Sequence, residues 1–322
     1  MEVSVVIPAY NCAATIRATL DSVLEQTVSP HEILVMDDGS TDATPSLLES
    51  YKPRITVFRQ LNAGPSKARN VLIDRSRGDL IAFLDSDDLW HPRYLEVQQS
   101  LFEKYPQAVA TFTEHVVFDG CGNFLWTSDP LDVPRSVELI EPLNFLKRYN
   151  ATPGYFYPSF CCVPRRVLGK IGREPFQVRL VRAEDCYFYN LLALYGPVVR
   201  VSTPLVAYRI LDGSLSSDVV QLCGGAVQAF ELLEERFREC LEEEYYSAFR
   251  QAYAVRRRDY AKALWGARRI SEGRQQLRQS LASSRALTSV AKSLGLLLLT
   301  YVPPSLRPTR LAGAQQRRVS EP

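Results

Sequence analysis

The sequence has few of the residues that form imidazole or thiolate metal centres. Three histidines occur among 322 residues, and the seven cysteines include no CxxC pair and no Cys/His cluster with ligand spacing. An odd number of scattered cysteines predicts reduced, mostly buried thiols of a cytoplasmic protein rather than a disulfide framework. A histidine-based metal site is therefore not expected.

Long apolar runs are also missing. No stretch of about 18 consecutive apolar residues occurs, so the sequence predicts no membrane-spanning helix. The first residues, MEVSVVIPAYN, contain neither a basic region nor a cleavage site. They predict a β-strand and no signal peptide.

The small net charge of +2 hides an uneven distribution. Residues 250–322 contain 15 basic and 3 acidic residues (+12), and residues 1–249 contain 23 basic and 33 acidic residues (−10), which together give +2. Such polarity is typical of a chain with two surfaces that have different partners.

Short apolar runs alternate with helical patterns in the first third of the chain. The runs are residues 3–8, 32–37, 55–59 and 80–85. Each run is continuous rather than alternating, which favours central strands of a parallel sheet with helices on both faces. The sequence thus predicts an α/β fold over residues 1–220, followed by a helical region over residues 221–322.

The remaining chain is less regular. Residues 108–118 predict a strand, residues 127–160 a loop-rich segment, and residues 184–195 a helix with apolar residues on one face. The runs VVRVS and LVAYR predict two short strands. Near the end of the chain, a helical hairpin is expected to turn near Gly273.

Polar groups follow three of the predicted strands. They are Pro8 to Asn11, Asp37 with Asp38, and the segment Asp85-Ser86-Asp87-Asp88. In parallel sheets, ligands bind outside the carboxyl ends of the strands. Three carboxylates in four positions repel one another, so this segment requires a positive partner. The alternative is a solvated turn in which an aspartate caps the next helix.

Two other ligand sites are disfavoured by what this region lacks. The D-x-D-x-D-G ladder of a calcium loop is absent, and no G-x-G-x-x-G follows the first strand. A calcium loop and a dinucleotide-binding fold are therefore not expected.

Six motifs in order resemble family 2 inverting glycosyltransferases with a GT-A fold, over about residues 3–217. They are VSVVIPAYN, VMDDGSTDAT, NAGPSKARN, FLDSDD, RAEDCYFYNLL and PLVAYRILDGSLS. The resemblance implies a GT-A-type, mostly parallel sheet and a nucleotide-sugar-binding catalytic domain in residues 1–220. It also implies hexosyl transfer from a nucleotide diphosphate sugar, most often a UDP-sugar, to a hydroxyl of a glycan or lipid-linked acceptor in cell-surface polysaccharide synthesis.

The resemblance also assigns residues. It implies that Asp87 binds Mg²⁺ or Mn²⁺ and that Asp85 contacts the ribose or the donor sugar, so the missing positive partner would be a metal carrying a diphosphate. Asp88 is expected to cap the following helix. The residues that match the nucleotide pocket are Pro8, Tyr10, Asn11, Asp38 and, by its position in KARN, Arg69. For Tyr10, core packing is the alternative.

Asp185 matches the general base of the family. Its neighbour Glu184 and partial burial would raise its pKa, whereas the dipole of a helix N-terminus would lower it. The alternative is that both form an acidic first turn of a helix. Leu211 stands where many relatives have histidine, so Arg209 and Ser214 are the candidate diphosphate contacts. Because of this departure, an alternative function remains: a catalytically impaired scaffold that binds nucleotide at the membrane.

The last third of the chain carries no specific motif. Its apolar stripe from Leu287 to Tyr301, flanked by basic residues, predicts peripheral binding of residues 286–322 to an anionic membrane at the inner face of the plasma membrane. A helical cap packed on the catalytic domain is the alternative. Nucleic acid is not an expected partner, because arginine-rich helices alone are not a recognition module.

Overall fold

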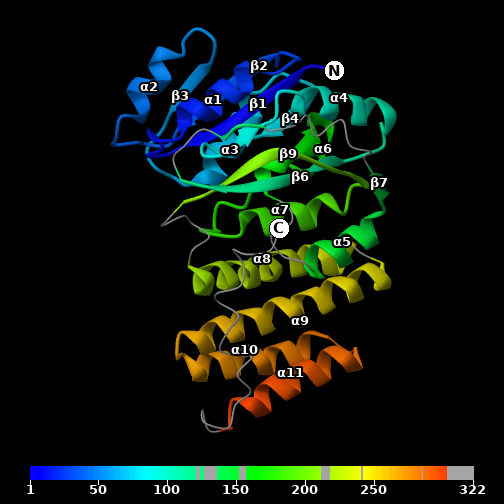
Figure 1. The fold of residues 1–322 in the computed structure, drawn as a ribbon. Helices are drawn as coiled ribbons and strands as arrows, with labels where there is room; N and C mark the ends of the chain where they lie inside the picture. Colours follow the sequence, from blue (N-terminus) through cyan, green and yellow to red (C-terminus); the bar gives the residue numbers. More distant parts are fainter. Residues whose placement is uncertain are drawn as a thin grey trace. The chain divides into compact units, whose positions relative to one another are not determined.

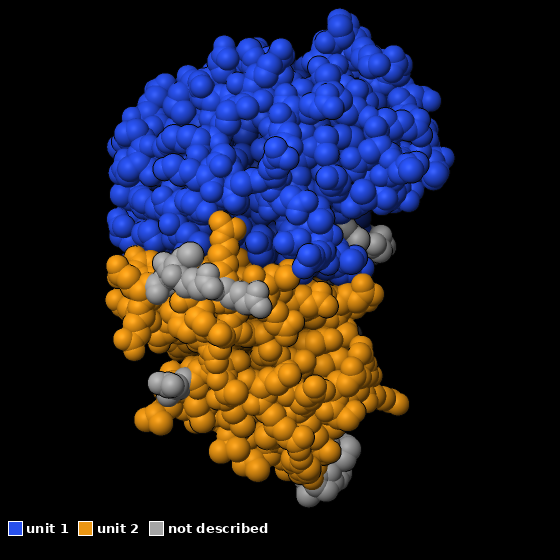
Figure 2. Space-filling view, turned by 180° about the vertical axis from the view of Figure 1, so that it is seen from behind, with its two compact units in different colours: residues 1–217 blue, residues 218–322 orange. Residues whose placement is uncertain are grey.

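The protein divides into two compact units, residues 1–217 and residues 218–322 (Figure 2). The computed structural model describes residues 1–120, 124–126, 136–151, 157–211, 218–240, 242–284 and 286–302. The two units are described separately below.

Unit 1 begins with the predicted alternation of strands and helices (Figure 1). Its first elements are β1 (Val3–Ala9), α1 (Ile16–Leu24), β2 (Glu32–Asp37), α2 (Thr44–Ser50), β3 (Thr56–Arg59), α3 (Pro65–Arg75), β4 (Leu80–Phe83), β5 (Leu89–Trp90) and α4 (Tyr94–Lys104). All residues of β1 and β4 are buried, as their continuous apolar runs predict for central strands.

The second half of unit 1 completes the sheet. Its elements are β6 (Ala110–Asp119), β7 (Val137–Ile140), α5 (Pro142–Ala151), η1 (Pro158–Phe160), β8 (Cys161–Pro164), α6 (Arg165–Ile171), α7 (Glu184–Leu192) and β9 (Val198–Ile210). The strand order is β3-β2-β1-β4-β8-β6-β9-β5, with β7 also paired to β9. Strands β1 to β4 pair in parallel, whereas β8 is antiparallel to both β4 and β6. The predicted α/β fold is confirmed.

The strand ends that carry polar groups lie at one edge of this sheet. Ala9 pairs with Asp37 at the ends of β1 and β2, and the Asp38 amide donates to the Ala9 carbonyl over 2.8 Å. Asp85 follows β4, which runs parallel to β1. The sheet therefore brings the segments after β1, β2 and β4 together, as the sequence predicts.

Two expectations about the second half of unit 1 were wrong. The segment 127–160, predicted to be loop-rich, contains β7, α5 and η1 among its described residues. The two short strands expected at 198–202 and 205–209 form the single strand β9. Its register against β6 shifts around Glu114, where Pro204 lies opposite. A bulge accommodates the proline without ending the strand.

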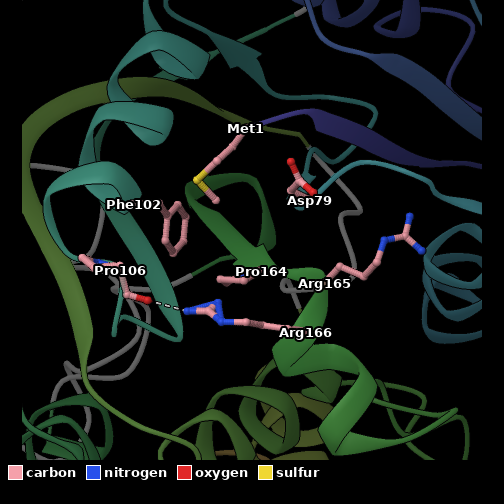
Figure 3. Close-up of a pocket in the computed structure, with 7 residues that line it drawn as sticks. All are labelled: Met1, Asp79, Phe102, Pro106, Pro164, Arg165 and Arg166. Carbon is pink, nitrogen blue, oxygen red and sulfur yellow. Dashed lines mark hydrogen bonds between the residues drawn. The ribbon is translucent and has the colours of Figure 1, made fainter.

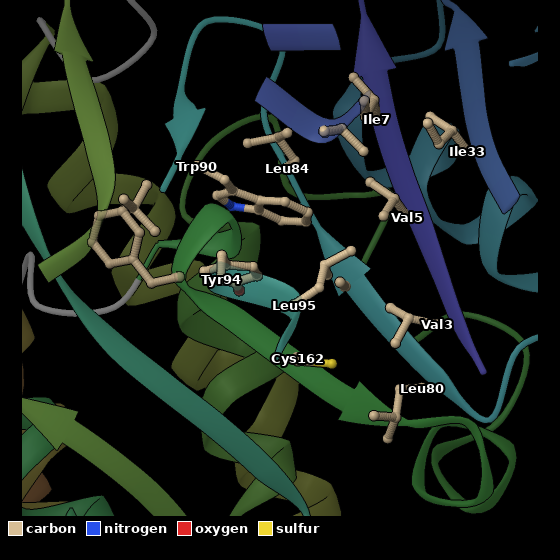
Figure 4. Close-up of a cluster of buried hydrophobic side chains, with 14 of the residues drawn as sticks. Val3, Val5, Ile7, Ile33, Leu80, Leu84, Trp90, Tyr94, Leu95 and Cys162 are labelled. Carbon is tan, nitrogen blue, oxygen red and sulfur yellow. The ribbon is translucent and has the colours of Figure 1, made fainter. Parts of the chain in front are cut away.

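The core of unit 1 lies along β1, β4 and β8, where apolar side chains from these strands meet α1 and α4 (Figure 4). Trp90 is 1% exposed and stacks on Tyr94 with ring centroids 4.1 Å apart. Its indole N–H donates to the Ser159 carbonyl over 2.9 Å. Trp90 is therefore a core residue.

Unit 2 is a stack of helices, as the sequence predicts (Figure 1). They are α8 (Val219–Cys240), α9 (Glu243–Gly266), α10 (Ile270–Ser283) and α11 (Leu287–Leu299). Among the residues that the structure describes, no helix combines the length and apolarity that a bilayer crossing requires.

The hairpin between α9 and α10 turns earlier than expected. Arg268, with a φ of 62°, lies in the turn, and Gly273 lies inside α10. A Cβ at Gly273 would lie 3.1 Å from the Ala261 carbonyl oxygen. The glycine thus permits close packing of α10 on α9 rather than forming the turn.

Candidate active site

The loop that follows β4 is held by hydroxyl groups on two sides. Thr15, just before α1, and Thr19 of α1 donate to the Ser86 carbonyl over 2.9 and 3.0 Å. On the other side, the Asp85 amide donates to the Ser159 hydroxyl over 3.0 Å. These buried contacts fix the backbone that carries the acidic cluster.

Sequence reasoning missed these anchoring residues. Thr15 and Thr19 are four positions apart, and both are buried on the face of α1 that meets the loop. Two threonines at that spacing on an otherwise apolar helix face were a usable signal. For Ser159, which is fully buried 74 positions from Asp85, the sequence contained no local signal.

Asp88 does not cap a helix, contrary to the prediction. Strand β5 follows it, and α4 begins at Tyr94. Asp88 is fully buried, and its Oδ1 accepts a hydrogen bond of 3.0 Å from the backbone amide of Arg209. Burial raises the pKa of this carboxyl well above its ordinary value, and the charges of Asp87 and Asp85 add to the rise. Asp88 is an internal brace between the loop and β9.

Arg69 gives the acidic cluster a positive partner within the chain. Its guanidinium donates to Asp85 Oδ1 over 2.5 Å and to Glu184 Oε1 over 2.8 Å. Arg69 is 4% exposed and lies 5.2 Å from the ring centroid of Phe176. The negative charges on both sides raise its pKa against the effect of burial. Arg69 thus joins the loop after β4 to the start of α7.

Asp87 is less deeply buried than Asp88 and has no cationic side chain as an ion-pair partner among the described residues. Arg209 donates to the Asp87 carbonyl oxygen over 2.8 Å. Burial and the charge of Asp85 raise the pKa of Asp87 to about 6. Such a carboxylate is stabilised by an added cation.

The chain alone does not provide a complete metal site there. Across the described part of the chain, no group of three or more His, Cys, Asp or Glu residues has the geometry to hold a metal ion. Mg²⁺ is commonly bound by one or two carboxylates together with substrate phosphates and water. The unpaired Asp87 carboxylate fits that mode, in which a phosphate ligand supplies the remaining oxygens.

The end of β1 presents one exposed side chain and one anchor. Tyr10 is 49% exposed, so the core-packing alternative fails for it. Asn11 has a φ of 46°, and its Oδ1 accepts from the Thr41 amide over 2.8 Å. Its own amide donates to the Ser40 hydroxyl over 3.0 Å. Pro8 is buried inside β1, opposite Met36.

Asp38 organises the segment that leads into α3. It is 3% exposed, and its carboxylate accepts hydrogen bonds from the Gln60 side chain and from the amides of Ala63 and Gly64, over 2.7 to 2.9 Å. A carboxylate offers about four lone-pair positions. One position therefore remains for a ligand N–H.

Asp185 lies in the first turn of α7, beside the glutamate that Arg69 binds. Its Oδ1 accepts from the Cys186 amide over 2.7 Å. Burial raises the pKa of Asp185 to about 7, and the charge of Glu184 adds to the rise, while Arg69 opposes it. The balance left open by the sequence thus falls on the side of a raised pKa. An aspartate with a pKa near neutrality can accept a proton at physiological pH.

Arg209 is almost fully buried and braces the acidic loop. It is 2% exposed, and its guanidinium donates to the carbonyls of Asp87 and Gly120 over 2.8 and 2.7 Å. Leu211, at the position where histidine was expected, is half-buried just after β9. The other candidate diphosphate contact, Ser214, lies outside the described residues.

A separate cavity of about 550 Å³ lies where β1 and β4 begin, at the opposite edge of the sheet (Figure 3). It is lined by Met1, Asp79, Phe102, Pro106, Pro164, Arg165 and Arg166. The guanidinium groups of Arg165 and Arg166 donate to the carbonyls of Gly78 and Pro106. The cavity contains none of the residues assigned above.

Comparison with known proteins identifies the family. The profile of "Glycosyl transferase family 2" matches residues 4–171. The chain belongs to this family. EpsH of Bacillus subtilis is 41% identical over 218 residues, which are 65% of this chain and 60% of EpsH. Chondroitin synthase of Escherichia coli is 36% identical over 126 residues, or 38% of this chain and 18% of the synthase. Three further curated relatives are covered to 15–31% of their length.

Solved structures share the fold of this family 2 chain. S. aureus TarS 1–349 in complex with UDP-GlcNAc aligns with a TM-score of 0.62 and 20% identity, covering 97% of this chain and 83% of TarS. Mannosyltransferase PcManGT from Pyrobaculum calidifontis, in complex with GDP-Man and Mn²⁺, aligns with a TM-score of 0.59 and 19% identity. The alignment covers 94% of this chain and 81% of PcManGT. At these identities the likeness establishes the fold alone.

Proposed function

We propose that the protein is an inverting, metal-dependent glycosyltransferase that moves a sugar from a nucleotide diphosphate sugar to a hydroxyl group. One observation carries the proposal. Arg69 binds Asp85 of the acidic loop and Glu184, the neighbour of Asp185, with the same guanidinium group. This bridge holds the acidic loop and the first turn of α7 on two sides of one buried cation, which supports the proposal that the donor and the base meet there.

The donor would lie along the carboxyl ends of β1, β2 and β4. Tyr10 offers an exposed ring against which a base can stack, and Asp38 has one lone-pair position for a base N–H. The uracil N–H fits this acceptor, and a UDP-sugar is the proposed donor. TarS, with bound UDP-GlcNAc, supports this choice.

The diphosphate requires positive charge, and no described cationic side chain forms an ion pair with the Asp87 carboxylate. We therefore assign Asp87 as a ligand of a divalent ion. The structure of PcManGT, which contains both GDP-Man and Mn²⁺, supports this assignment. Such an ion, when bound, stabilises the charge that develops on the leaving diphosphate. Asp85, held by Arg69, would contact the ribose or the sugar, and Arg209 would keep the loop in place.

Asp185 would act as the general base. The acceptor oxygen forms its bond to the anomeric carbon while the bond from that carbon to the diphosphate oxygen breaks. The hydroxyl proton passes to the Asp185 carboxylate, and the diphosphate leaves with the electron pair. Attack from the face opposite the diphosphate inverts the anomeric centre.

The acceptor class follows from the relatives and remains part of the proposal. Chondroitin synthase supports a role in the assembly of a polysaccharide, and a lipid-linked glycan is the other acceptor of the same class. Either acceptor presents a sugar hydroxyl to the edge of the sheet where Asp185 lies.

Nucleotide release tests the proposal most simply. Purified protein is incubated with UDP-GlcNAc, UDP-glucose, UDP-galactose and GDP-mannose, with Mn²⁺ or with chelator, and the nucleoside diphosphate is measured. We expect slow, metal-dependent hydrolysis of one UDP-sugar without acceptor, and its loss in Asp185→Asn. Release that is insensitive to chelator would contradict the metal assignment. Binding of a nucleotide without turnover of any donor would favour the impaired scaffold, for which Leu211 is the motivation.

A further inference from the structure

Helix α11 packs with its polar side inward. Ser289 and Ser293 of α11, and Thr300 just after it, are at most 4% exposed. The large apolar side chains on the other side are exposed instead: Leu287 85%, Leu294 45%, Leu298 60% and Tyr301 57%. This is the reverse of the usual pattern for a helix on the surface of a globular protein.

One buried and one half-buried arginine explain why the serine face is the inner one. Arg258 of α9 is 7% exposed and donates to the hydroxyls of Ser289 and Ser293 over 2.9 and 3.1 Å. Arg274 of α10 donates to the hydroxyl and the carbonyl of Thr300, each over 3.0 Å. The hydroxyl face satisfies these cations, so the leucine face is directed away from α9 and α10. Within the described part of unit 2, α11 is the last helix of the stack and packs on α10 and α9 (Figure 1).

Positive charge borders the leucine face. Arg274 lies 3.9 Å from the ring centroid of Tyr301, and Arg278 donates to the Tyr301 hydroxyl over 3.4 Å. The chain from residue 273 to residue 320 contains eight basic residues and no acidic residue. The two arginines at Tyr301 make this border complementary to a negatively charged partner.

We propose that the exposed face of α11, formed by Leu287, Leu294, Leu298 and Tyr301, docks on the surface of an anionic lipid bilayer. Leucines enter the boundary between headgroups and acyl chains, and the basic border contacts lipid phosphates. Tyr301, with an apolar ring and a polar hydroxyl, suits that boundary. A second copy of this chain is a poorer occupant, because pairing two such faces would bring the arginines beside Tyr301 of both copies together. The inference goes beyond the proposed function and does not depend on it.

Vesicle flotation with the full chain tests the docking. Vesicles of phosphatidylcholine alone are compared with vesicles that also contain phosphatidylglycerol. We expect binding to the anionic vesicles and its loss in high salt, since the screening length falls from about 8 Å at physiological ionic strength to about 3 Å at 1 M. Equal binding to both vesicles, or no binding to either, would overturn the proposal.

Matched variants place the contact on α11. The double variant Leu294→Gln, Leu298→Gln should weaken partitioning by about a hundredfold, because each leucine that enters the bilayer contributes about a factor of ten or more. Leu61→Gln, at a 91% exposed leucine of unit 1, should partition like the unchanged chain. If the double variant binds anionic vesicles as strongly as the unchanged chain, the assignment of the contact to this face is wrong. Thermal unfolding and sedimentation show whether the variants fold and whether the chain self-associates. Self-association that the double variant abolishes, without vesicle binding, would identify the face as a contact between copies.

A fluorescence variant gives an independent measurement. Tyr301→Trp keeps an aromatic ring at a 57% exposed position, and Leu61→Trp is its control. The Tyr301→Trp emission should shift to shorter wavelength when anionic vesicles are added, and the Leu61→Trp emission should not. Emission that is already at short wavelength without lipid would show that the chain itself covers α11, and would overturn the proposal.

Discussion

Two buried arginines show how differently the two units use charge. Arg69 in unit 1 lies between the carboxylates of Asp85 and Glu184, which raise its pKa. Arg258 in unit 2 is bound by the hydroxyls of Ser289 and Ser293, and burial lowers its pKa. Unit 1 therefore concentrates opposite charges at one edge of its sheet. Unit 2 uses neutral oxygens to hold a cation and turns an apolar helix face outward.

The comparison teaches that burial of a charge alone does not mark a reactive site. Both arginines are less than 10% exposed. The difference lies in what surrounds them. The acidic loop and the first turn of α7, which Arg69 joins, contain three carboxyl groups whose pKa values are raised by burial and by neighbouring carboxylates: Asp87, Asp88 and Asp185. Perturbed groups of this kind cluster at functional sites.

The largest expected effect is on the reaction itself. Asp185→Asn keeps the shape of the side chain but removes its ability to accept a proton. Transfer should fall by about 10²–10⁴-fold, the range typical of general-base removal. The fall is measured as nucleotide release with saturating donor, and donor affinity should change little. A parallel collapse of donor affinity would assign Asp185 to binding instead. The matched variant Asp259→Asn, in α9, should leave the rate unchanged.

Removing each arginine sharpens the comparison directly. Arg69→Met leaves two partly buried carboxylates without their cation and should cost about 3–5 kcal/mol of unfolding free energy. Arg258→Met removes a buried charge whose hydroxyl partners retain other contacts, since Ser293 also donates to the Ser289 carbonyl. We expect its cost to be below about 1 kcal/mol. Denaturant unfolding of the two variants measures both losses. Equal losses of unfolding free energy would contradict the difference proposed between the two arginines.

The two faces of unit 2 can be compared in the same way. Leu277 of α10 is 1% exposed and Leu298 of α11 is 60% exposed. Leu277→Ala should lower the unfolding free energy by about 2–5 kcal/mol, because it leaves a cavity in the core. Leu298→Ala should change it by less than about 0.5 kcal/mol in the absence of lipid. A large cost for Leu298→Ala would show that its side chain is part of the core.

The smallest expected effect is a pH-dependent stability. The pKa of Asp185 rises from an ordinary 3.8 to about 7 on folding. Its contribution to stability is therefore present at acid pH and is lost as the pH rises between these values. At pH 8, Asp185→Asn should raise the free energy of unfolding by about 1–3 kcal/mol relative to the unchanged chain. At pH 4 the rise should be smaller. A gain that is equal at both values would show that the carboxyl is not perturbed.

Much of unit 1 could be predicted from the sequence because its signals are local. Continuous apolar runs give the central strands, and parallel pairing brings their carboxyl ends to one edge. The role of Asp88 could not be predicted, because its partner Arg209 is 121 positions away. The single bulged strand β9 depends likewise on its register with β6.

Unit 2 shows where a helical pattern stops being informative. The stripe from Leu287 to Tyr301 was visible in the sequence, but the pattern does not say which face of a helix is buried. That choice depends on Arg258 and Arg274, which lie on other helices. The sequence predicts a turn near Gly273, whereas the close approach of this glycine to Ala261 is a tertiary contact that no local pattern reveals.

The central claim is that Asp87 and its neighbours bind a nucleotide diphosphate together with a divalent ion. The most direct test is the thermal stabilisation of the chain by UDP with Mn²⁺, compared with UDP and chelator. At about 100 times its Kd, a ligand that binds the folded state stabilises by about 2.7 kcal/mol. We predict this stabilisation with Mn²⁺ and its loss in Asp87→Ala, whose unliganded melting temperature should not fall. Stabilisation by UDP and Mn²⁺ that persists in Asp87→Ala would contradict the account.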